Sequence, residues 1–204
     1  MAAQKYITGT CSISNNQVFL NGEKIFAGAT KPMDELLLSI YQHFQFSYPK
    51  FHKMDNLSKL GWLAAELLLK DFDKSNYHAE QVGTVLANAN ASLDMDLKYY
   101  DSIKDVPSPS LFVYTLPNIV AGEICIRHNF KGENAFFVQP NFDIGFIEQQ
   151  VSFLLDNNLL QACICGWIDV LGQDYKAMLF LVEKVKKENA EEFSAKSMEM
   201  IFNK

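Results

Sequence analysis

The chain has 204 residues, 49% of them hydrophobic, and a formal net charge of -6. This length and apolar content are enough for a sizeable core, and we expect a single domain over residues 1–204. The acidic balance argues against nucleic acid and anionic membranes as partners, because both require clustered Lys and Arg.

Nothing in the sequence predicts a targeting or membrane segment. We expect no signal peptide before Tyr6, because the first residues lack a charged start followed by an apolar run. The longest uncharged stretch, 106–122, contains three prolines together with Ser and Asn residues, which argues against a transmembrane helix. The sequence therefore predicts a cytoplasmic protein without membrane insertion.

The first part of the chain alternates β and α patterns. We expect a strand over 5–13 and a hairpin whose strands, 18–20 and 23–26, are joined by a turn at Asn21–Gly22. Two amphipathic helices follow, one opened by Pro32 and reaching Phe44, the other over 56–70. The apolar run 82–87 is typical of a buried parallel strand.

The second part repeats the alternation. Helices are expected over 93–100 and 119–127, with a rigid Pro-Ser-Pro-Ser connection at 107–110. The sequence then predicts a strand over 135–138, two strands over 162–168 and 177–183 joined through Gly172, and a closing amphipathic helix. This order predicts an α/β layered domain.

One further helix, capped by Asp143 and reaching about Asn157, has an unusual apolar pattern. Five apolar residues make one stripe, and Phe146 and Phe153 make a second stripe beside it. We therefore expect this helix to be buried on more than one side.

The cysteines lie within apolar segments and lack the CxxC or His-containing spacings of zinc sites. We expect them to be reduced and mostly buried, and we expect neither a metal nor a cofactor. Cys163 and Cys165 are two residues apart in a predicted strand, so both should point to one face. The four cysteines are Cys11, Cys125, Cys163 and Cys165.

Several segments, taken in order, resemble the N-terminal half of the β-ketoacyl synthases. Residues 7–9 (Ile-Thr-Gly) resemble the family's opening strand and turn, and 54–60 (Met-Asp-Asn-Leu-Ser-Lys-Leu) are similar to its Met-Asp-x-Phe-Ser segment. Residues 116–124 followed by 131–134 resemble the family's Pro-Asn helix and Gly-Pro-Asn turn. The resemblance covers most of the chain. It implies a thiolase-like half-fold with a mixed, mostly parallel five-stranded sheet and helices on both faces.

In that family the nucleophilic cysteine sits at the start of a buried helix, where the helix N-terminus lowers the thiol pKa. Counting without gaps from Gly132 places this position at Asn141, and a two-residue gap places it at Gln139. Neither amide is a competent nucleophile, so we expect no catalytic residue and no condensation by the chain alone. Gln139, Asn141 and Phe142 become candidates for an acyl pocket.

The family's two catalytic histidines belong to a C-terminal half that has no counterpart in this sequence. None of the four histidines here lies in a segment that resembles those motifs, so each is expected to be exposed or locally hydrogen-bonded. They are His43, His52, His78 and His128.

The resemblance extends to chain length factors, synthase-like subunits that lack the cysteine and pair with an active synthase in polyketide or aryl-polyene systems. It implies a full-length ketosynthase partner, or self-association, in fatty-acid, polyketide or aryl-polyene-type biosynthesis. Acyl carrier proteins are acidic, so any docking of a carrier should fall mainly on the partner. The candidate dimer-interface residues are Ala135, Phe136, Phe137, Val138 and Phe146. The alternative for this strand is an ordinary internal core strand.

Two other functions stay open on the sequence. A small acyl-transfer or hydrolytic enzyme would use Cys125, Cys163 or Cys165 as its nucleophile, although none has a motif with a base around it. A homodimeric acyl-binding protein would use the same pocket as a receptor site, which the fold alone does not exclude.

Overall fold

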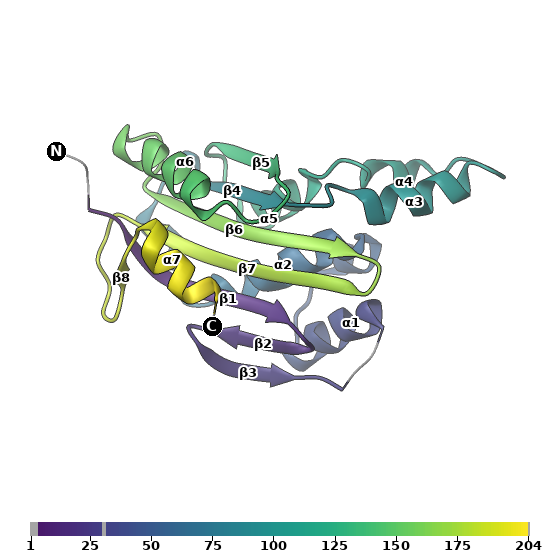
Figure 1. The fold of residues 1–204 in the computed structure, drawn as a ribbon, viewed down its shortest axis with the longest axis horizontal. Coiled ribbons are helices and arrows are strands. Elements are labelled where there is room, and N and C mark those ends of the chain that lie inside the picture. The colour runs from purple at the N-terminus through teal and green to yellow at the C-terminus, as the bar shows by residue number, and fades with distance from the viewer. Residues whose placement is uncertain (1–3, 30–31, 204) are drawn as a thin grey trace.

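One mixed β-sheet runs through the molecule, with helices on both faces (Figure 1). The structure is a computed structural model that describes residues 4–29 and 32–203. The prediction that no signal peptide precedes Tyr6 concerns in part residues 1–3, which lie outside these ranges. The strands run in the order β3-β2-β1-β7-β6-β4-β5, and β8 pairs with β1. They are β1 (Tyr6–Ser14), β2 (Gln17–Leu20), β3 (Glu23–Ala27), β4 (Val82–Asn88), β5 (Asn134–Val138), β6 (Ala162–Leu171), β7 (Asp174–Glu183) and β8 (Glu191–Glu192).

The α/β class is confirmed, but the sheet has eight strands rather than five, and parallel pairing is confined to β5-β4-β6. The other described pairings are antiparallel. Short turns join β1 to β2, β2 to β3 and β6 to β7, and such turns cannot connect parallel strands. Strand β1 also pairs antiparallel with β7 and β8, which lie far from it in sequence. The predicted Asn21–Gly22 turn is present, with positive φ values of 52° and 81°.

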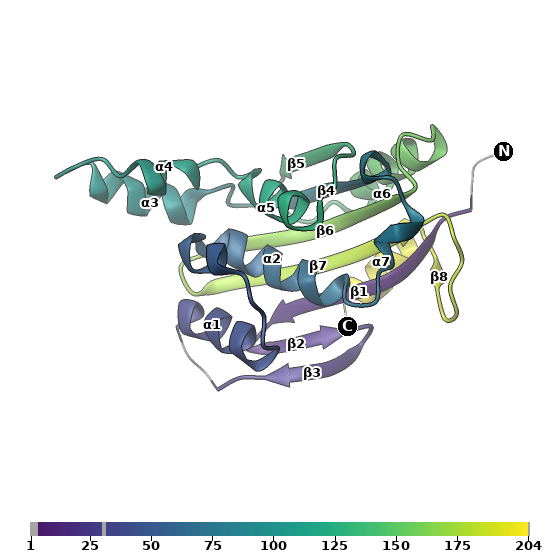
Figure 2. The same ribbon diagram turned by 180° about the vertical axis from the view of Figure 1, so that it is seen from behind.

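Two helical layers enclose the sheet (Figures 1 and 2). One face is covered by α1 (Met33–His43), η1 (Pro49–Lys53), α2 (Asn56–Leu68) and α5 (Ile119–His128), and the other by α6 (Ile144–Asp156) and α7 (Ala195–Phe202). Two short turns, η2 (Lys74–Asn76) and η3 (Ala79–Gln81), lead into β4. Each face has its own apolar core. Strand β4 is buried at every position, as a parallel strand between two layers must be.

The side chains of β6 alternate between the two cores. Cys163 and Cys165 both join the core under α6, whereas Ile164 joins the core under α2, so the prediction that the two thiols share a face is confirmed. The described cysteines are all free. Their environment is that of ordinary packing residues.

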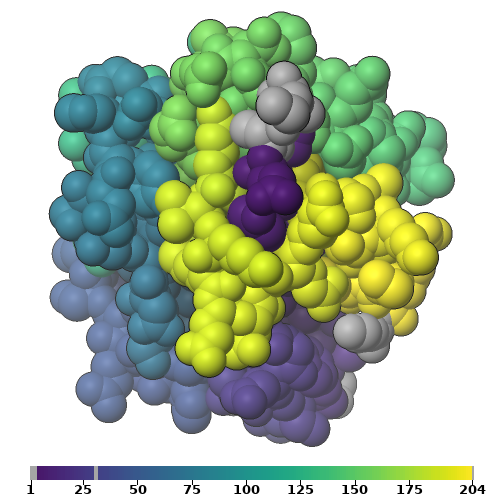
Figure 3. All heavy atoms as spheres, turned by 90° about the vertical axis from the view of Figure 1, so that its left-hand side faces the viewer, coloured from purple at the N-terminus to yellow at the C-terminus, as the bar shows by residue number. Residues whose placement is uncertain are grey.

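The C-terminal segment packs against the sheet where β1 begins. Strand β8 pairs with Tyr6 and Ile7 of β1, and the Phe193 amide donates to the Lys5 carbonyl oxygen at 2.9 Å. Figure 3 shows the loop before β8 lying on the surface beside the start of β1. The Ser194 hydroxyl then caps α7 by accepting from the Ser197 amide.

Helix α6 departs from the prediction of burial on several sides. Its buried residues form one stripe, Ile147, Val151 and Leu155, and this stripe packs on the sheet. Of the predicted second stripe, Phe146 is half-buried and Phe153 is 59% exposed. The helix is therefore covered on one side only.

A helical hairpin projects past the β6–β7 turn (Figures 1 and 2). It consists of α3 (Leu93–Ser102) and α4 (Pro109–Val113). The predicted rigid connection at 107–110 is therefore partly helical. Ser108 caps α4 and Pro109 occupies its first turn, where a missing N–H costs nothing.

Within the described ranges, no helix is long and apolar enough to cross a membrane.

Candidate functional site

The candidate site lies where the parallel strands β4, β5 and β6 end, because carboxyl ends of parallel strands meet at one margin of a sheet. Asn88 is fully buried at the end of β4. Its side chain closes a turn by accepting from the Ala91 amide at 2.9 Å and donating to the Ala91 carbonyl oxygen at 2.8 Å. Ala91 has a positive φ of 48°, a conformation that this double hydrogen bond holds in place.

Asp169 of β6 fixes the same turn from the neighbouring strand. One carboxylate oxygen accepts from the Ala89 and Asn90 amides at 3.1 and 3.0 Å, and the other accepts from the Asn90 side chain at 2.8 Å. The sequence prediction missed Asp169, although a carboxylate in an otherwise apolar strand was a detectable signal.

Gln139 and Asn141 both lie in the turn between β5 and α6. The Gln139 amide donates to the Asn88 carbonyl oxygen at 2.8 Å, which ties this turn to the end of β4. The Gln139 side-chain oxygen is buried and has no hydrogen-bond partner among the described residues, and leaving such an atom unpaired costs about 1–3 kcal/mol. Asn141 is exposed.

Asp143 begins α6 as predicted. Its carboxylate accepts from the Phe146 amide at 2.9 Å and satisfies one of the free donors of the first turn. The start of α6 therefore already holds a negative charge. This charge offsets the positive end of the helix dipole, which in a catalytic cysteine site would stabilise a thiolate.

Phe142 belongs to an aromatic cluster under α7. Its ring lies 5.7 Å from Trp167 of β6 and 5.0 Å from Phe202 of α7, measured between ring centroids. The ammonium of Lys176 lies 3.5 Å from the centre of the Phe202 ring, and burial lowers the pKa of this lysine. The structure thus brings Phe142 together with three residues that the sequence did not single out.

Strand β5 is the last strand at its edge and, among the described strands, pairs only with β4. Thr84 donates to Glu133 at 3.0 Å, and Gln139 donates to Asn88, so the odd-numbered residues of 133–139 bond to β4. The alternating pattern directs the N–H and C=O groups of Phe136 and Val138 to the open edge. Strand β5 therefore lies at an edge of the described sheet and not in its interior.

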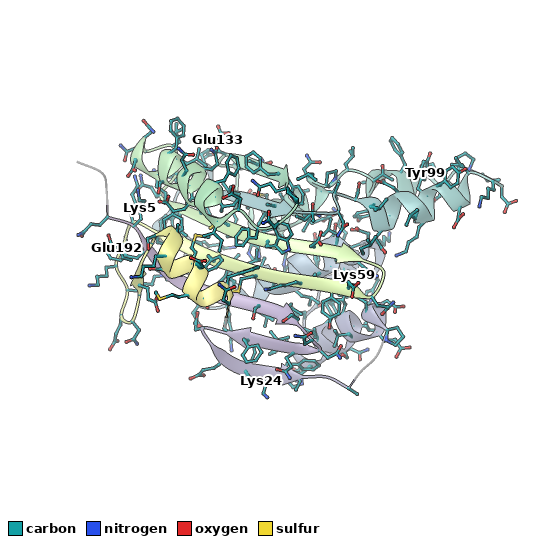
Figure 4. All side chains as sticks on the ribbon, in the orientation of Figure 1. Lys5, Lys24, Lys59, Tyr99, Glu133 and Glu192 are labelled. Carbon is teal, nitrogen blue, oxygen red and sulfur yellow. The ribbon has the colours of Figure 1, made fainter. Side chains whose placement is uncertain are left out.

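The side chains along β5 are apolar. Ala135, Phe136 and Phe137 are half-buried, Val138 is 55% exposed, and the Phe137 ring meets Phe146 edge-on at 4.8 Å. Figure 4 shows Glu133, just before β5, and Lys24 of β3 at opposite edges of the sheet. Strand β3 carries charges that protect an edge against pairing, whereas 135–138 carries none.

The candidate thiols are poor nucleophiles in this fold. Cys163 and Cys165 are fully buried, and burial raises the pKa of each well above its ordinary value. Burial also raises the pKa of the half-buried Cys125 thiol and brings that of Cys11 to about 12. Since the thiolate is the reactive form, the geometry disfavours a cysteine enzyme.

The histidines belong to other parts of the molecule. His43, His52 and His128 lie in α1, η1 and α5, on the face of the sheet opposite α6, and His78 precedes η3. The His128 ring nitrogen lies 2.8 Å from a carboxylate oxygen of Glu66. Burial raises the Glu66 pKa, but hydrogen bonds from His128 and Arg127 outweigh burial and hold it below its ordinary value. Across the described ranges, no three His, Cys, Asp or Glu residues are grouped closely enough to hold a metal ion.

No protein-family model matches the chain, and the search of curated proteins gives no match either. Solved structures do match. A chain of the ishigamide ketosynthase/chain length factor superposes with a TM-score of 0.66 at 17% identity over 93% of this chain and 64% of its own length. A second match is a chain from AntDE:AntF, a type II PKS acyl-carrier protein in complex with its ketosynthase bound to the hexaketide. Its TM-score is 0.62 at 14% identity, over 90% of this chain and 63% of its own length.

A third match comes from the ketosynthase ApeO in complex with its chain length factor ApeC from Xenorhabdus doucetiae. Its TM-score is 0.58 at 11% identity, over 88% of this chain and 79% of the other. The chain therefore has the ketosynthase-like, thiolase-type fold that its sequence segments predict. It spans somewhat less than two thirds of the length of the first two matched chains.

Proposed function

We propose that this chain is a non-catalytic ketosynthase-like subunit of the chain length factor type, which pairs with an active ketosynthase. The turn before α6 carries the proposal, since Gln139, Asn141 and Asp143 supply amides and a carboxylate there, but no thiol. An amide does not attack a thioester, and the Asp143 carboxylate disfavours a second anion at the same helix end.

The open edge of β5 supports a partner. Its backbone groups are ready to pair with another strand, and its apolar side chains lack the charges that usually prevent such pairing. Helix α6 adds the exposed Phe153 on the outer layer. The solved structures with this fold include a ketosynthase in complex with a chain length factor. We assign Ala135, Phe136, Phe137, Val138 and Phe146 to the interface.

Gln139, Asn141 and Phe142 are proposed to border the acyl chain that the partner elongates. Phe142 contributes an aromatic surface, and the unpaired Gln139 oxygen would accept a hydrogen bond from the partner or from a bound acyl intermediate. The substrates are acyl chains of fatty-acid, polyketide or aryl-polyene type, delivered by an acyl carrier protein that docks mainly on the partner.

Co-expression tests the proposal directly. The chain is produced with a full-length ketosynthase, and the complex is analysed by size-exclusion chromatography with light scattering. We expect a stable complex that contains both chains. A second arm replaces the ketosynthase cysteine by alanine and should abolish condensation while leaving the complex intact. The proposal fails if the two chains elute separately, or if condensation survives that replacement.

A further inference from the structure

The α3–α4 arm, residues 93–116, is the part of the molecule least explained by its own packing. It extends beyond the sheet, and Tyr99 in Figure 4 marks how far it lies from the main body. The Tyr99 ring packs on Phe112 of α4 with centroids 5.5 Å apart, and Met95 is buried at the root. These contacts lie on the inner side of the hairpin, where its two helices face each other and meet the main body.

The outer side of the arm is apolar. Leu97, Tyr100, Ile103, Val106 and Val113 are all exposed, Val106 to 79%. Leu93, Leu97 and Tyr100 recur at helical spacing and form a stripe on α3 that faces solvent. Burial of such a stripe is the usual source of helix stability, so an exposed stripe indicates an interaction surface.

The arm is fixed at its root. The Ser92 hydroxyl donates to the Thr115 carbonyl oxygen at 2.6 Å and so joins the two ends of the hairpin. The Gly172 amide in the β6–β7 turn donates to Asp94 at 3.0 Å. These bonds set the direction in which the arm leaves the sheet, so its apolar side is presented in one orientation.

The charges on the arm indicate which kind of partner could bind its apolar side. Residues 93–116 contain four aspartates and two lysines, which gives the arm a formal net charge of -2. Both lysines are already paired, Lys98 with Asp94 at 2.7 Å and Lys104 with Asp101 at 2.6 Å. Asp96 and Asp105 have no cationic partner among the described residues. The arm is therefore an apolar surface with an acidic margin.

A second copy of this chain fits that acidic margin poorly, because the whole chain carries a formal net charge of -6. An anionic membrane is repelled for the same reason. A different protein with an apolar groove and basic residues at its rim is complementary to both the apolar side chains and the acidic margin of the arm.

The arm also starts at the proposed interface. The turn from Asn88 to Ser92 leads directly into α3. The Asn88 carbonyl oxygen in this turn accepts a hydrogen bond from the Gln139 amide at the end of β5. A partner paired along the edge of β5 would thus lie within reach of the arm.

We propose that the α3–α4 arm embraces the partner subunit and enters an apolar, basic-rimmed groove on it, separate from the strand pairing at β5. The inference rests on the proposed function, in which that partner is a ketosynthase.

The test measures binding of the chain to the ketosynthase by isothermal titration calorimetry. The arm variant is Tyr100→Asp with Val106→Asp, and Ile126→Asp is the matched control because Ile126 is 67% exposed on α5, away from the arm. We expect the arm variant to weaken binding by about 100-fold or more and the control by less than about threefold. A single charge reversal, Asp105→Lys, should weaken binding by about tenfold and flatten its dependence on salt.

Two patterns separate this inference from the proposed function. If the unmodified chain does not bind the ketosynthase, the proposed function itself fails. If the unmodified chain binds and the arm variants bind equally well, the arm inference alone is overturned. It is also overturned if the arm variants abolish a self-dimer seen by sedimentation, or block binding to anionic vesicles. Asp105→Lys changes one exposed side chain, so it decides the matter even if the double variant misfolds.

Discussion

A charge placed on the edge of β5 should break the proposed complex without unfolding the chain. Val138 is the residue to change, because its side chain is 55% exposed and its N–H faces the open edge. Val138→Lys leaves the ladder to β4 untouched, since that ladder uses the odd-numbered residues of β5. The matched control is Ala27→Lys, an exposed position on β3 at the other edge of the same sheet.

The size of the effect follows from burial. Full burial of a valine contributes about 1.5–3 kcal/mol, so a partner that covers the exposed half of Val138 gains about 1 kcal/mol. A lysine in its place must also leave water without an anionic partner, which adds at least about 1–3 kcal/mol. The total of about 2–4 kcal/mol corresponds to a dissociation constant about 30- to 700-fold higher.

Biolayer interferometry against the immobilised ketosynthase measures this constant. Thermal denaturation of each free variant shows whether the fold is kept. We expect Val138→Lys to lose affinity as calculated and Ala27→Lys to bind like the unmodified chain. Equal affinity of the two lysine variants would refute the assignment of β5 to the interface.

Other predictions concern the fold and the missing nucleophile. Glu183 is 1% exposed and accepts from Tyr77 at 2.6 Å, so Glu183→Ala leaves the Tyr77 hydroxyl without this acceptor and should lower the free energy of unfolding by about 1–3 kcal/mol in urea titrations, whereas the exposed Glu192→Ala should change little. Burial and this hydrogen bond raise the Tyr77 pKa, so its contribution to stability should be complete below about pH 10 and fall at higher pH, and Tyr77→Phe should remove that loss. Iodoacetamide should label Cys125 slowly and before the buried thiols, as peptide mass spectrometry would show; rapid labelling of a buried cysteine at neutral pH would revive the enzyme hypothesis. Asn141→Cys should be labelled readily because this position is exposed, yet condensing activity should stay absent in a malonyl-dependent assay.

Local chemistry made much of this fold predictable. The Asn21–Gly22 turn, the Asp143 cap and the shared face of Cys163 and Cys165 each depend on a few neighbouring residues, and all three are present. The resemblance of short segments to ketosynthases also predicted the fold that the superpositions show.

Features that depend on distant partners were not predictable in this way. The pairing of β1 with β7 joins residues far apart in sequence, so neither the strand number nor the share of antiparallel pairs followed from local patterns. The role of Asp169 arises only when β6 lies beside the turn after β4. An aliphatic stripe and a neighbouring aromatic stripe predicted burial of α6 on more than one side, but no described element covers Phe153, a surface that a partner would bury.

The most direct test of the central claim is a condensation assay with malonyl- and acyl-carrier substrates, run with this chain alone, with the ketosynthase alone and with the complex. The elongated acyl products are measured by mass spectrometry. The account predicts no product from the chain alone and the full range of product lengths only from the complex. Elongation by the purified chain alone would contradict it.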